Sequence, residues 1–382
     1  GAASPNMGRA TSPALVALMT LLNIRMGFWL PNPGQLESWT QERERRGAES
    51  GGGEPPGFSF DDVFRVELQE IQNRWAQLAD GSERNLATQD GRPVLERTPR
   101  HDLAGIGFSG GGIRSAALNL GMTQALDQRG VFEHFDYMST VSGGGYLGSS
   151  LSTLMRRRSV SEPSVRKAEP ESSVGDVFRW RVRPIALVRE ILGKLDETSR
   201  WVNVSDGGHL ENLAAIELLR RQCRYIIIGD GEADPDHQFT GLATLIRTAR
   251  IDLGVRIDMN VDEIRLKDER ISQEHWAIGR IHYPNQDTYG HLLYLKSSFT
   301  GREDVVIQQY RSRNPSFPHE STADQAFTEG QFEAYRSLGQ HIAEQALEHA
   351  NAEREMSFAD LEQWFEELDR HRPAAPKGAR AV

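Results

Sequence analysis

Residues 104–121, AGIGFSGGGIRSAALNLG, join a short apolar run to a helix-like stretch through three consecutive glycines. Glycine loses more conformational freedom on folding than other residues, so three in a row at an element boundary indicate a specific requirement. Consecutive backbone N–H groups at a helix N-terminus can hold an anion. Gly110, Gly111 and Gly112 therefore predict either a tight turn or a site for a phosphate or an oxyanion. Arg114 adds a positive charge beside them.

The same stretch contains Gly105-x-Gly107-x-x-Gly110, the glycine spacing of dinucleotide-binding units. In such a unit the strand precedes the first glycine, whereas here the glycines lie inside the predicted strand 103–108. A P-loop would also require a Lys-Ser/Thr pair after the glycines, which this stretch lacks. Nucleotide binding by residues 105–112 remains an alternative function.

A second strand-to-helix junction, residues 139–148, reads STVSGGGYLG. Ser142 lies where a predicted strand meets a predicted helix, which is the arrangement of the nucleophile elbow in α/β hydrolases. Gly143 follows the serine, and Gly144 supplies the second glycine of the G-x-S-x-G pattern. Thr140 stands where that pattern has its first glycine. The alternative is an ordinary strand–turn–helix junction.

A third motif, VNVSDGGHLEN at residues 202–212, places Asp206 after a predicted strand and before Gly207 and Gly208. Open α/β folds bind ligands at the carboxyl ends of their strands, so this carboxylate and Ser142 could meet at one edge of the sheet. An aspartate at this place can also cap the following helix.

The chain has eleven histidines, of which His209 is nearest to a motif. We expect His209 to cap or orient the next helix, and His282 and His291 to be structural because they lie in strand-like runs. A serine and an aspartate without a histidine can still perform acyl transfer. The carboxylate takes the hydroxyl proton, and glycine N–H groups hold the oxyanion.

Strands and helices alternate between residues 103 and 296, which predicts an α/β fold with a mostly parallel sheet covered on both faces. The predicted strands are 103–108, 137–141, 201–204, 225–228, 255–259, 278–282 and 292–296. The predicted helices are 61–79, with Asp61 or Asp62 as its cap, 113–128, 145–158, 184–195, 211–222, 239–252, 324–350 and 358–370.

Composition excludes several classes of protein. The 382 residues are 38% hydrophobic and 26% charged with a net charge of −10, which argues against broad nucleic-acid binding. The single cysteine, Cys223, excludes an intramolecular disulfide and a cysteine-based zinc cluster. Asp230, Asp234 and Asp236 resemble a cation loop but lack the final glutamate of the calcium pattern, so we expect an acidic turn. We predict no metal and no cofactor.

The chain divides into three predicted parts, 1–58, 59–350 and 351–382. The first holds an apolar segment, 13–30, followed by a linker rich in proline, glycine and charge. Arg25 interrupts the apolar segment, which is too short before that charge to span a membrane comfortably. It is predicted to be a core helix or an interfacial helix.

In chain order, GGGIRSA, the serine in VSGGG, and SDGG resemble the motifs of the patatin-like phospholipases, including the catalytic domains of cytosolic phospholipases. The resemblance covers about residues 61–254. It implies a three-layer fold and a lipid acyl hydrolase with a Ser–Asp dyad. On this reading Ser142 is the nucleophile and Asp206 the base. The Gly110–Gly112 loop forms the oxyanion hole, supported by Arg114.

The N-terminal segment resembles one that large bacterial members carry between the serine and the aspartate. Here it comes first, and the polar loop 156–175 stands in its place. We interpret it as a rearranged part of the catalytic domain that forms an apolar mouth. The resemblance implies a bacterial protein, cytoplasmic or peripherally membrane-associated, acting on a lipid or phospholipid. A catalytically silent, membrane-associated scaffold on the same fold is a further alternative.

Overall fold

The computed structural model describes residues 59–76, 84, 86–89, 92–159, 207–267, 270–350 and 355–372, without the side chains of 92–93 and 154–159. The N-terminal apolar segment, the predicted helix 184–195, the predicted strand 201–204 and Asp206 lie outside these ranges.

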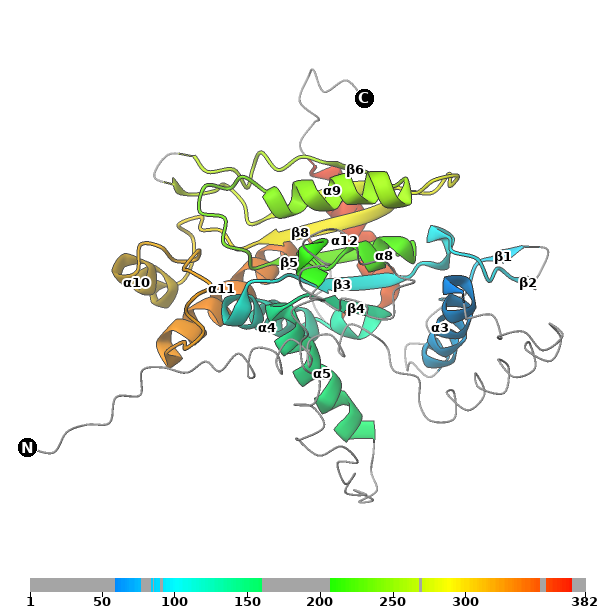
Figure 1. Ribbon diagram of the computed structural model, residues 1–382, viewed down its shortest axis with the longest axis horizontal. Helices are drawn as coiled ribbons and strands as arrows, with labels where there is room; N and C mark the ends of the chain where they lie inside the picture. The colour runs from blue at the N-terminus through cyan, green and yellow to red at the C-terminus, as the bar shows by residue number, and fades with distance from the viewer. Residues whose placement is uncertain are drawn as a thin grey trace, which may run out of the picture.

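A six-stranded sheet forms the centre of the molecule (Figure 1), with strand order β4-β3-β5-β8-β7-β6. Its strands are β3 (Ala104–Phe108), β4 (Tyr137–Thr140), β5 (Tyr225–Asp230), β6 (Arg256–Met259), β7 (Trp276–His282) and β8 (Gly290–Lys296). The first four in spatial order are parallel, and β7 and β6 are added antiparallel. The predicted mostly parallel α/β sheet is confirmed. A separate two-stranded sheet pairs β1 (Thr88–Gln89) with β2 (Arg92–Pro93).

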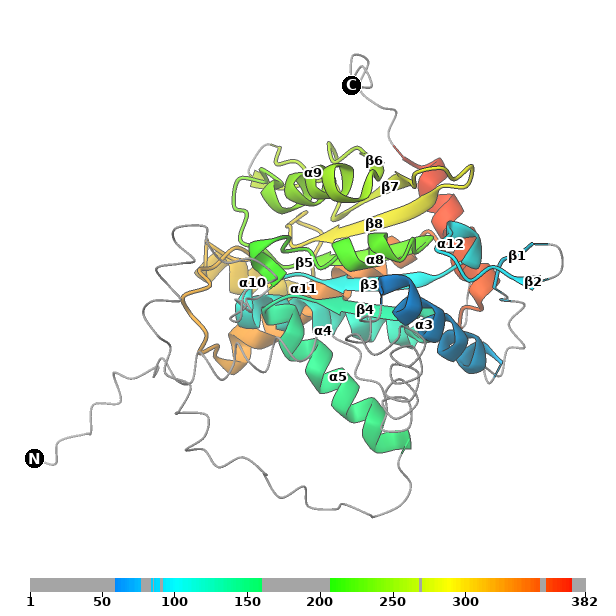
Figure 2. The same cartoon turned by 45° about the vertical axis from the view of Figure 1, so that its right-hand side comes forward.

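Helices cover both faces of this sheet and give three layers (Figure 2). On one face lie α4 (Gly112–Gln128), α11 (Glu329–Leu347) and α12 (Phe358–Arg370). On the other lie α3 (Phe60–Trp75), α8 (Ile216–Arg220) and α9 (Thr240–Leu253). The remaining described helices are α5 (Gly143–Ser159), α10 (Val305–Arg313) and the short 3-10 turns Pro99–His101, Phe132–His134 and Gly207–His209.

The burial of strand β5 on both faces explains why its first four residues, 225–228, form a continuous apolar run. Successive side chains of a strand point to opposite faces. Tyr225 and Ile227 join the core beside α4, whereas Ile226 and Ile228 join the core beside α8 and α9. Because both faces are covered, every residue of the strand is buried.

Helices α4 and α11 approach so closely that glycine is required on both. A β-carbon at Gly121 would lie 1.8 Å from the carbonyl oxygen of Arg336, and one at Gly339 would lie 1.9 Å from that of Leu118. Real β-carbons do not come this near to backbone atoms. This contact fixes the helix that leaves the glycine loop against the long C-terminal helix.

Two helix starts differ from the predicted ones. Helix α3 is capped by Ser59, whose hydroxyl accepts a hydrogen bond from the N–H of Asp62 in a capping box, so neither Asp61 nor Asp62 is the N-cap. Helix α11 begins at Glu329 after its N-cap Thr328, rather than at 324. Helix α10 was not predicted from the sequence.

The predicted helix 211–222 is reduced to α8. The Glu211 carboxylate accepts hydrogen bonds from the N–H groups of Leu213, Ala215 and Ile216. Ala214 has φ +61, a left-handed conformation that interrupts a right-handed helix. A buried glutamate therefore closes a turn where the apolar spacing alone indicated helix.

Replacing Gly339 by alanine should lower the free energy of unfolding by about 1–3 kcal/mol, because the added methyl group forces α11 away from α4. Gly330 is the matched control in the same helix, since no atom lies within 4 Å of its β-carbon position. Gly330→Ala should be neutral or stabilising by up to about 1 kcal/mol. Urea unfolding measures both variants, and equal effects would contradict the packing.

Candidate active site

Ser142 stands in the sharp turn between β4 and α5. Its φ is +48, a conformation that non-glycine residues rarely adopt and that costs about 1–3 kcal/mol. The turn is closed by backbone hydrogen bonds from Gly144 to the carbonyl of Val141, 2.9 Å, and from Gly145 to the carbonyl of Ser142, 2.9 Å. This strained serine between a strand and a helix has the geometry of a nucleophile elbow.

The two glycines after Ser142 are required by close backbone contacts. A β-carbon at Gly143 would lie 2.1 Å from the carbonyl oxygen of Gly112, and one at Gly144 would lie 2.2 Å from that of Phe108. The N–H of Gly144 also donates to the carbonyl of Ser109, 3.1 Å. The elbow and the glycine loop are therefore in direct backbone contact.

Thr140 occupies the place of the missing elbow glycine. It is the last residue of β4 and is half-buried. A β-carbon on Gly148, in the second turn of α5, would lie only 2.7 Å from the Thr140 methyl group. In the G-x-S-x-G pattern, the glycine at the first position leaves room between the strand and the following helix. Here Gly148 on the helix leaves that room for the Thr140 methyl group.

The glycine loop follows β3 and opens α4. Gly111 has φ +138 and Gly112 has φ +61, so both adopt conformations that L side chains disfavour. The N–H of Gly110 donates to the carbonyl of Asn212, 2.8 Å. Among the residues the structure describes, none accepts a hydrogen bond from the N–H of Gly111, Gly112 or Gly143. These three N–H groups lie where the glycine loop meets the elbow.

Arg114 is buried, with 2% of its surface exposed. Its Nε donates to the carbonyl of Gly231, 2.8 Å, and its Nη1 donates to the carbonyl of Glu320. Burial lowers the pKa of Arg114 below its usual value. The side chain therefore braces the start of α4 against two distant loops from inside the protein.

The described chain resumes at Gly207, directly after Asp206. β-Carbons at Gly207 and Gly208 would lie 3.5 and 3.2 Å from the methyl groups of Val141, the residue before Ser142. The glycines of the SDGG motif therefore pack against the elbow. His209 is exposed in a 3-10 turn, and the capping that we expected of it is done by Glu211.

An ion pair beneath the loop was not predicted from the sequence. Lys296 and Asp230 are each 1% exposed, and Lys296 Nζ lies 3.0 Å from Asp230 and 3.2 Å from Asp234. Although burial opposes its charge, the two aspartates raise the pKa of Lys296. Asp236 pairs with Arg270 at 2.9 Å. Lys296 and Arg270 thus balance the negative charges of the acidic turn.

Next to Asp230, Glu232 accepts a hydrogen bond of 2.6 Å from the side-chain amide of Asn212. Burial, followed by the charge of Asp230, raises the pKa of Glu232 to about 7. Asn212 thus links two loops, because its own carbonyl receives the N–H of Gly110. In the sequence, the only indication of this link is Asn212 itself, the last residue of the third motif.

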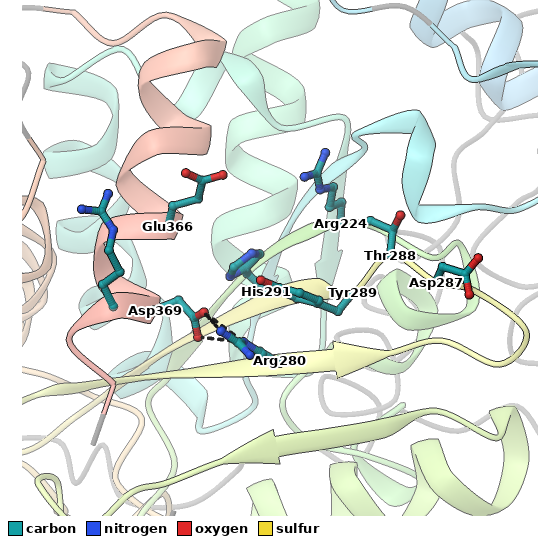
Figure 3. Close-up of a pocket in the computed structure, with 9 residues that line it drawn as sticks. Arg224, Arg280, Asp287, Thr288, Tyr289, His291, Glu366 and Asp369 are labelled. Atoms are coloured by element: carbon teal, nitrogen blue, oxygen red, sulfur yellow. Dashed lines mark hydrogen bonds and ion pairs between the residues drawn. The ribbon is translucent and has the colours of Figure 1, made fainter. Parts of the chain in front are cut away.

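Two cavities lie at opposite edges of the sheet. One of about 400 Å³ is lined by Gly208, His209, Asn212 and Glu232, at the edge where Ser142 lies. The other, about 360 Å³, lies near the first residues of β5 and β8 (Figure 3). The second cavity is far along the strands from the motifs, so it is not the candidate active site.

Charges around this second cavity are paired with one another. Figure 3 shows Asp369 facing Arg280, which donates to Asp369 Oδ1 at 3.2 Å and to Oδ2 at 2.9 and 2.5 Å. Arg224 pairs with Asp102. Burial lowers the pKa of His291 to about 4, so this histidine is neutral. His282 and His291 lie in β7 and β8, which agrees with their place in strand-like runs, although β8 begins two residues before the predicted strand 292–296.

Comparison with known families agrees with this geometry. Residues 107–265, which include the glycine loop, the elbow and the SDGG motif, match the family model described as patatin-like phospholipase. The chain is thus similar to the patatin-like phospholipases. No curated protein matches it.

Two solved structures of human GIVD cytosolic phospholipase A2 show a weaker likeness to this chain. The first has 15% identity and a TM-score of 0.17, covering 61% of this chain and 28% of its own. The second, in complex with methyl gamma-linolenyl fluorophosphonate, has 14% identity and a TM-score of 0.18, covering 85% and 38%. The chain thus spans well under half the length of either structure.

The dinucleotide-like spacing has a packing explanation in this patatin-like fold. Gly105 and Gly107 lie within β3. Their β-carbon positions are 2.8 Å from the side chain of Leu218 and 3.0 Å from the carbonyl of Leu213. The two glycines allow the α8 region to approach the strand, whereas only residues from Gly110 onward form the loop.

Gly148→Ala should destabilise the elbow by about 1–3 kcal/mol, because the new methyl group would overlap that of Thr140. Adding Thr140→Ser removes the opposing methyl group and should recover most of the loss. A double-mutant cycle on the free energy of unfolding measures this coupling. Additive effects of the two substitutions would contradict the proposed complementarity.

Proposed function

We propose that this protein hydrolyses carboxylic ester bonds of phospholipids or related lipids, with Ser142 as nucleophile and Asp206 as general base. The observation that carries the proposal is the strained Ser142 turn in backbone contact with the glycine loop. The match to the patatin-like phospholipase model supports the substrate class.

In the first step, Asp206 takes the proton of the Ser142 hydroxyl while Oγ attacks the ester carbonyl carbon. The carbonyl oxygen becomes an oxyanion. The N–H groups of Gly111, Gly112 and Gly143 are the proposed donors, because no described residue accepts from them. Each such donor is worth about 3–4 kcal/mol in the transition state.

Gly110 has a different part in this proposal. Its N–H is already used by the carbonyl of Asn212. Gly110 therefore sets the direction of the loop, and its neighbours supply the free donors. Arg114 holds the loop through Gly231 and adds a buried positive charge near the oxyanion.

In the second step the tetrahedral intermediate collapses. The C–O bond to the alcohol breaks, and Asp206 returns its proton to the leaving alkoxide, leaving an acyl group on Ser142. A water molecule then attacks the acyl carbonyl while Asp206 takes its proton. The bond between the acyl carbon and Ser142 Oγ breaks, Asp206 returns the proton to Oγ, and the carboxylic acid leaves. The packing of Gly207 and Gly208 on Val141 supports the nearness of Asp206 to Ser142.

We also propose that the protein reaches its lipid at a membrane surface. Within the described ranges, every helix is too short or too polar to cross a bilayer. The apolar segment at residues 13–30 has the composition to enter a membrane interface, with Phe28 and Trp29 at its end. The SDGG edge of the sheet is the place where a lipid ester would enter.

Nucleotide binding by the glycine loop is less favoured, because two of the three spaced glycines lie inside β3. A silent scaffold on this fold does not explain why a serine is held at positive φ, since such strain is usual at functional sites.

The proposal is tested by the hydrolysis of a short-chain acyl ester and of phospholipid vesicles. Ser142→Ala and Asp206→Asn should each lower kcat about 10³-fold or more, with KM little changed and the circular dichroism spectrum intact. Ser150→Ala is the matched control, because this exposed hydroxyl on α5 bonds only its own helix. Full turnover by Ser142→Ala would rule out the assignment.

A further inference from the structure

Three chemically suited side chains meet away from the candidate active site. His275 precedes β7, Glu303 lies in the loop between β8 and α10, and His341 lies on α11. One ligand atom of each lies within 4.8 Å of the other two. Figure 1 shows α10 and α11 beyond the arrowhead end of β8, where these segments come together.

Two of these side chains carry buried polar atoms with no partner. Glu303 is 2% exposed, and its Oε2 has no hydrogen-bond donor in the part of the chain that the structure describes. The buried Nε2 of His341 has no partner there either. A buried polar atom without a partner costs free energy. A ligand bound by both Glu303 Oε2 and His341 Nε2 would remove this cost.

His275 is completely buried, and its ring is fixed from behind. Its Nδ1 lies 2.7 Å from the Ser298 hydroxyl, which itself donates to the carbonyl of Lys296 at 3.2 Å. With the Ser298 hydroxyl donating to Lys296, Nδ1 is the donor to Ser298, and Nε2 faces both Glu303 Oε1 and the Thr300 hydroxyl at 3.3 Å. A ring nitrogen oriented by a hydrogen bond at the other nitrogen is usual for metal-binding histidines.

We propose that His275, Glu303 and His341 bind a zinc-like divalent cation. Two imidazole nitrogens and one carboxylate oxygen form a donor set that Zn²⁺ prefers, with water in the fourth tetrahedral position. His275 Nε2 lies 3.3 Å from Glu303 Oε1, and ligand atoms of all three residues lie within 4.8 Å of one another, which is close enough for them to share one ion.

The ion would join the loop that follows β8 to α11. Helix α11 packs against α4, which begins at the glycine loop. The site is thus structural: it fixes the support of the candidate active site and takes no part in ester cleavage.

The test uses the full chain, stripped with a chelator and titrated with ZnCl₂ at pH 7.5. The melting temperature of the wild type should rise with the logarithm of free zinc, and mass spectrometry of metals should find one ion per chain. His341→Ala should lose the shift, because it removes one ligand without breaking a hydrogen bond. His371→Ala, an exposed histidine, should keep it.

Cobalt provides a second readout that does not depend on variants. Co²⁺-loaded wild type should show the intense visible absorption of a tetrahedral site, and X-ray absorption of the zinc form should show two imidazole ligands. Absence of bound metal and of any thermal shift would overturn the proposal and leave a His275–Glu303 hydrogen bond. A shift retained by His341→Ala would equally overturn it, since the metal would bind elsewhere.

Discussion

The backbone contact between Gly143 and Gly112 is the constraint on which the rest of the site depends. No side chain fits between these two residues, because even a methyl group would lie 2.1 Å from a carbonyl oxygen. The contact holds the serine turn after β4 and the glycine-rich turn after β3 as neighbours. Parallel pairing of these two strands brings both turns to the same edge of the sheet. One steric requirement thus places Ser142, the proposed nucleophile, beside the proposed oxyanion donors.

Support for this contact comes from beneath the loop. Lys296 forms ion pairs with Asp230 and Asp234. Gly231, the residue after Asp230, donates its N–H to the Ser109 hydroxyl and accepts a hydrogen bond from Arg114 at its carbonyl. A buried ion pair contributes little net stability, but loss of either partner leaves an uncompensated charge. The pair therefore serves to fix the positions of backbone groups around the glycine loop. The proposed cation site would extend this bracing to the loop after β8 and to α11.

Local sequence predicted the six strands of the central sheet, the sheet type and the glycine-rich turns, because these follow from apolar runs and from glycine, but it did not predict β1 and β2. It did not reveal partners far apart in the chain. Asn212 receives the N–H of Gly110, and the side chain of Gln325 receives that of Ile113. The cluster of His275, Glu303 and His341 joins three segments that are far apart in the chain, so no sequence spacing identified it. The helix expected over 211–222 failed because a buried Glu211 took up the backbone N–H groups. The roles of Ser142 and Asp206 and the division at 58 and 350 stay predictions.

The central claim is that Ser142 is a nucleophile activated by its turn. The most direct measurement treats the full chain with a long-chain alkyl fluorophosphonate and maps the modified peptide by mass spectrometry. The account predicts one adduct, on Ser142, and no adduct in protein unfolded before treatment, since the reactivity depends on the folded turn. An unmodified Ser142 peptide, or an adduct on a different serine, would contradict it.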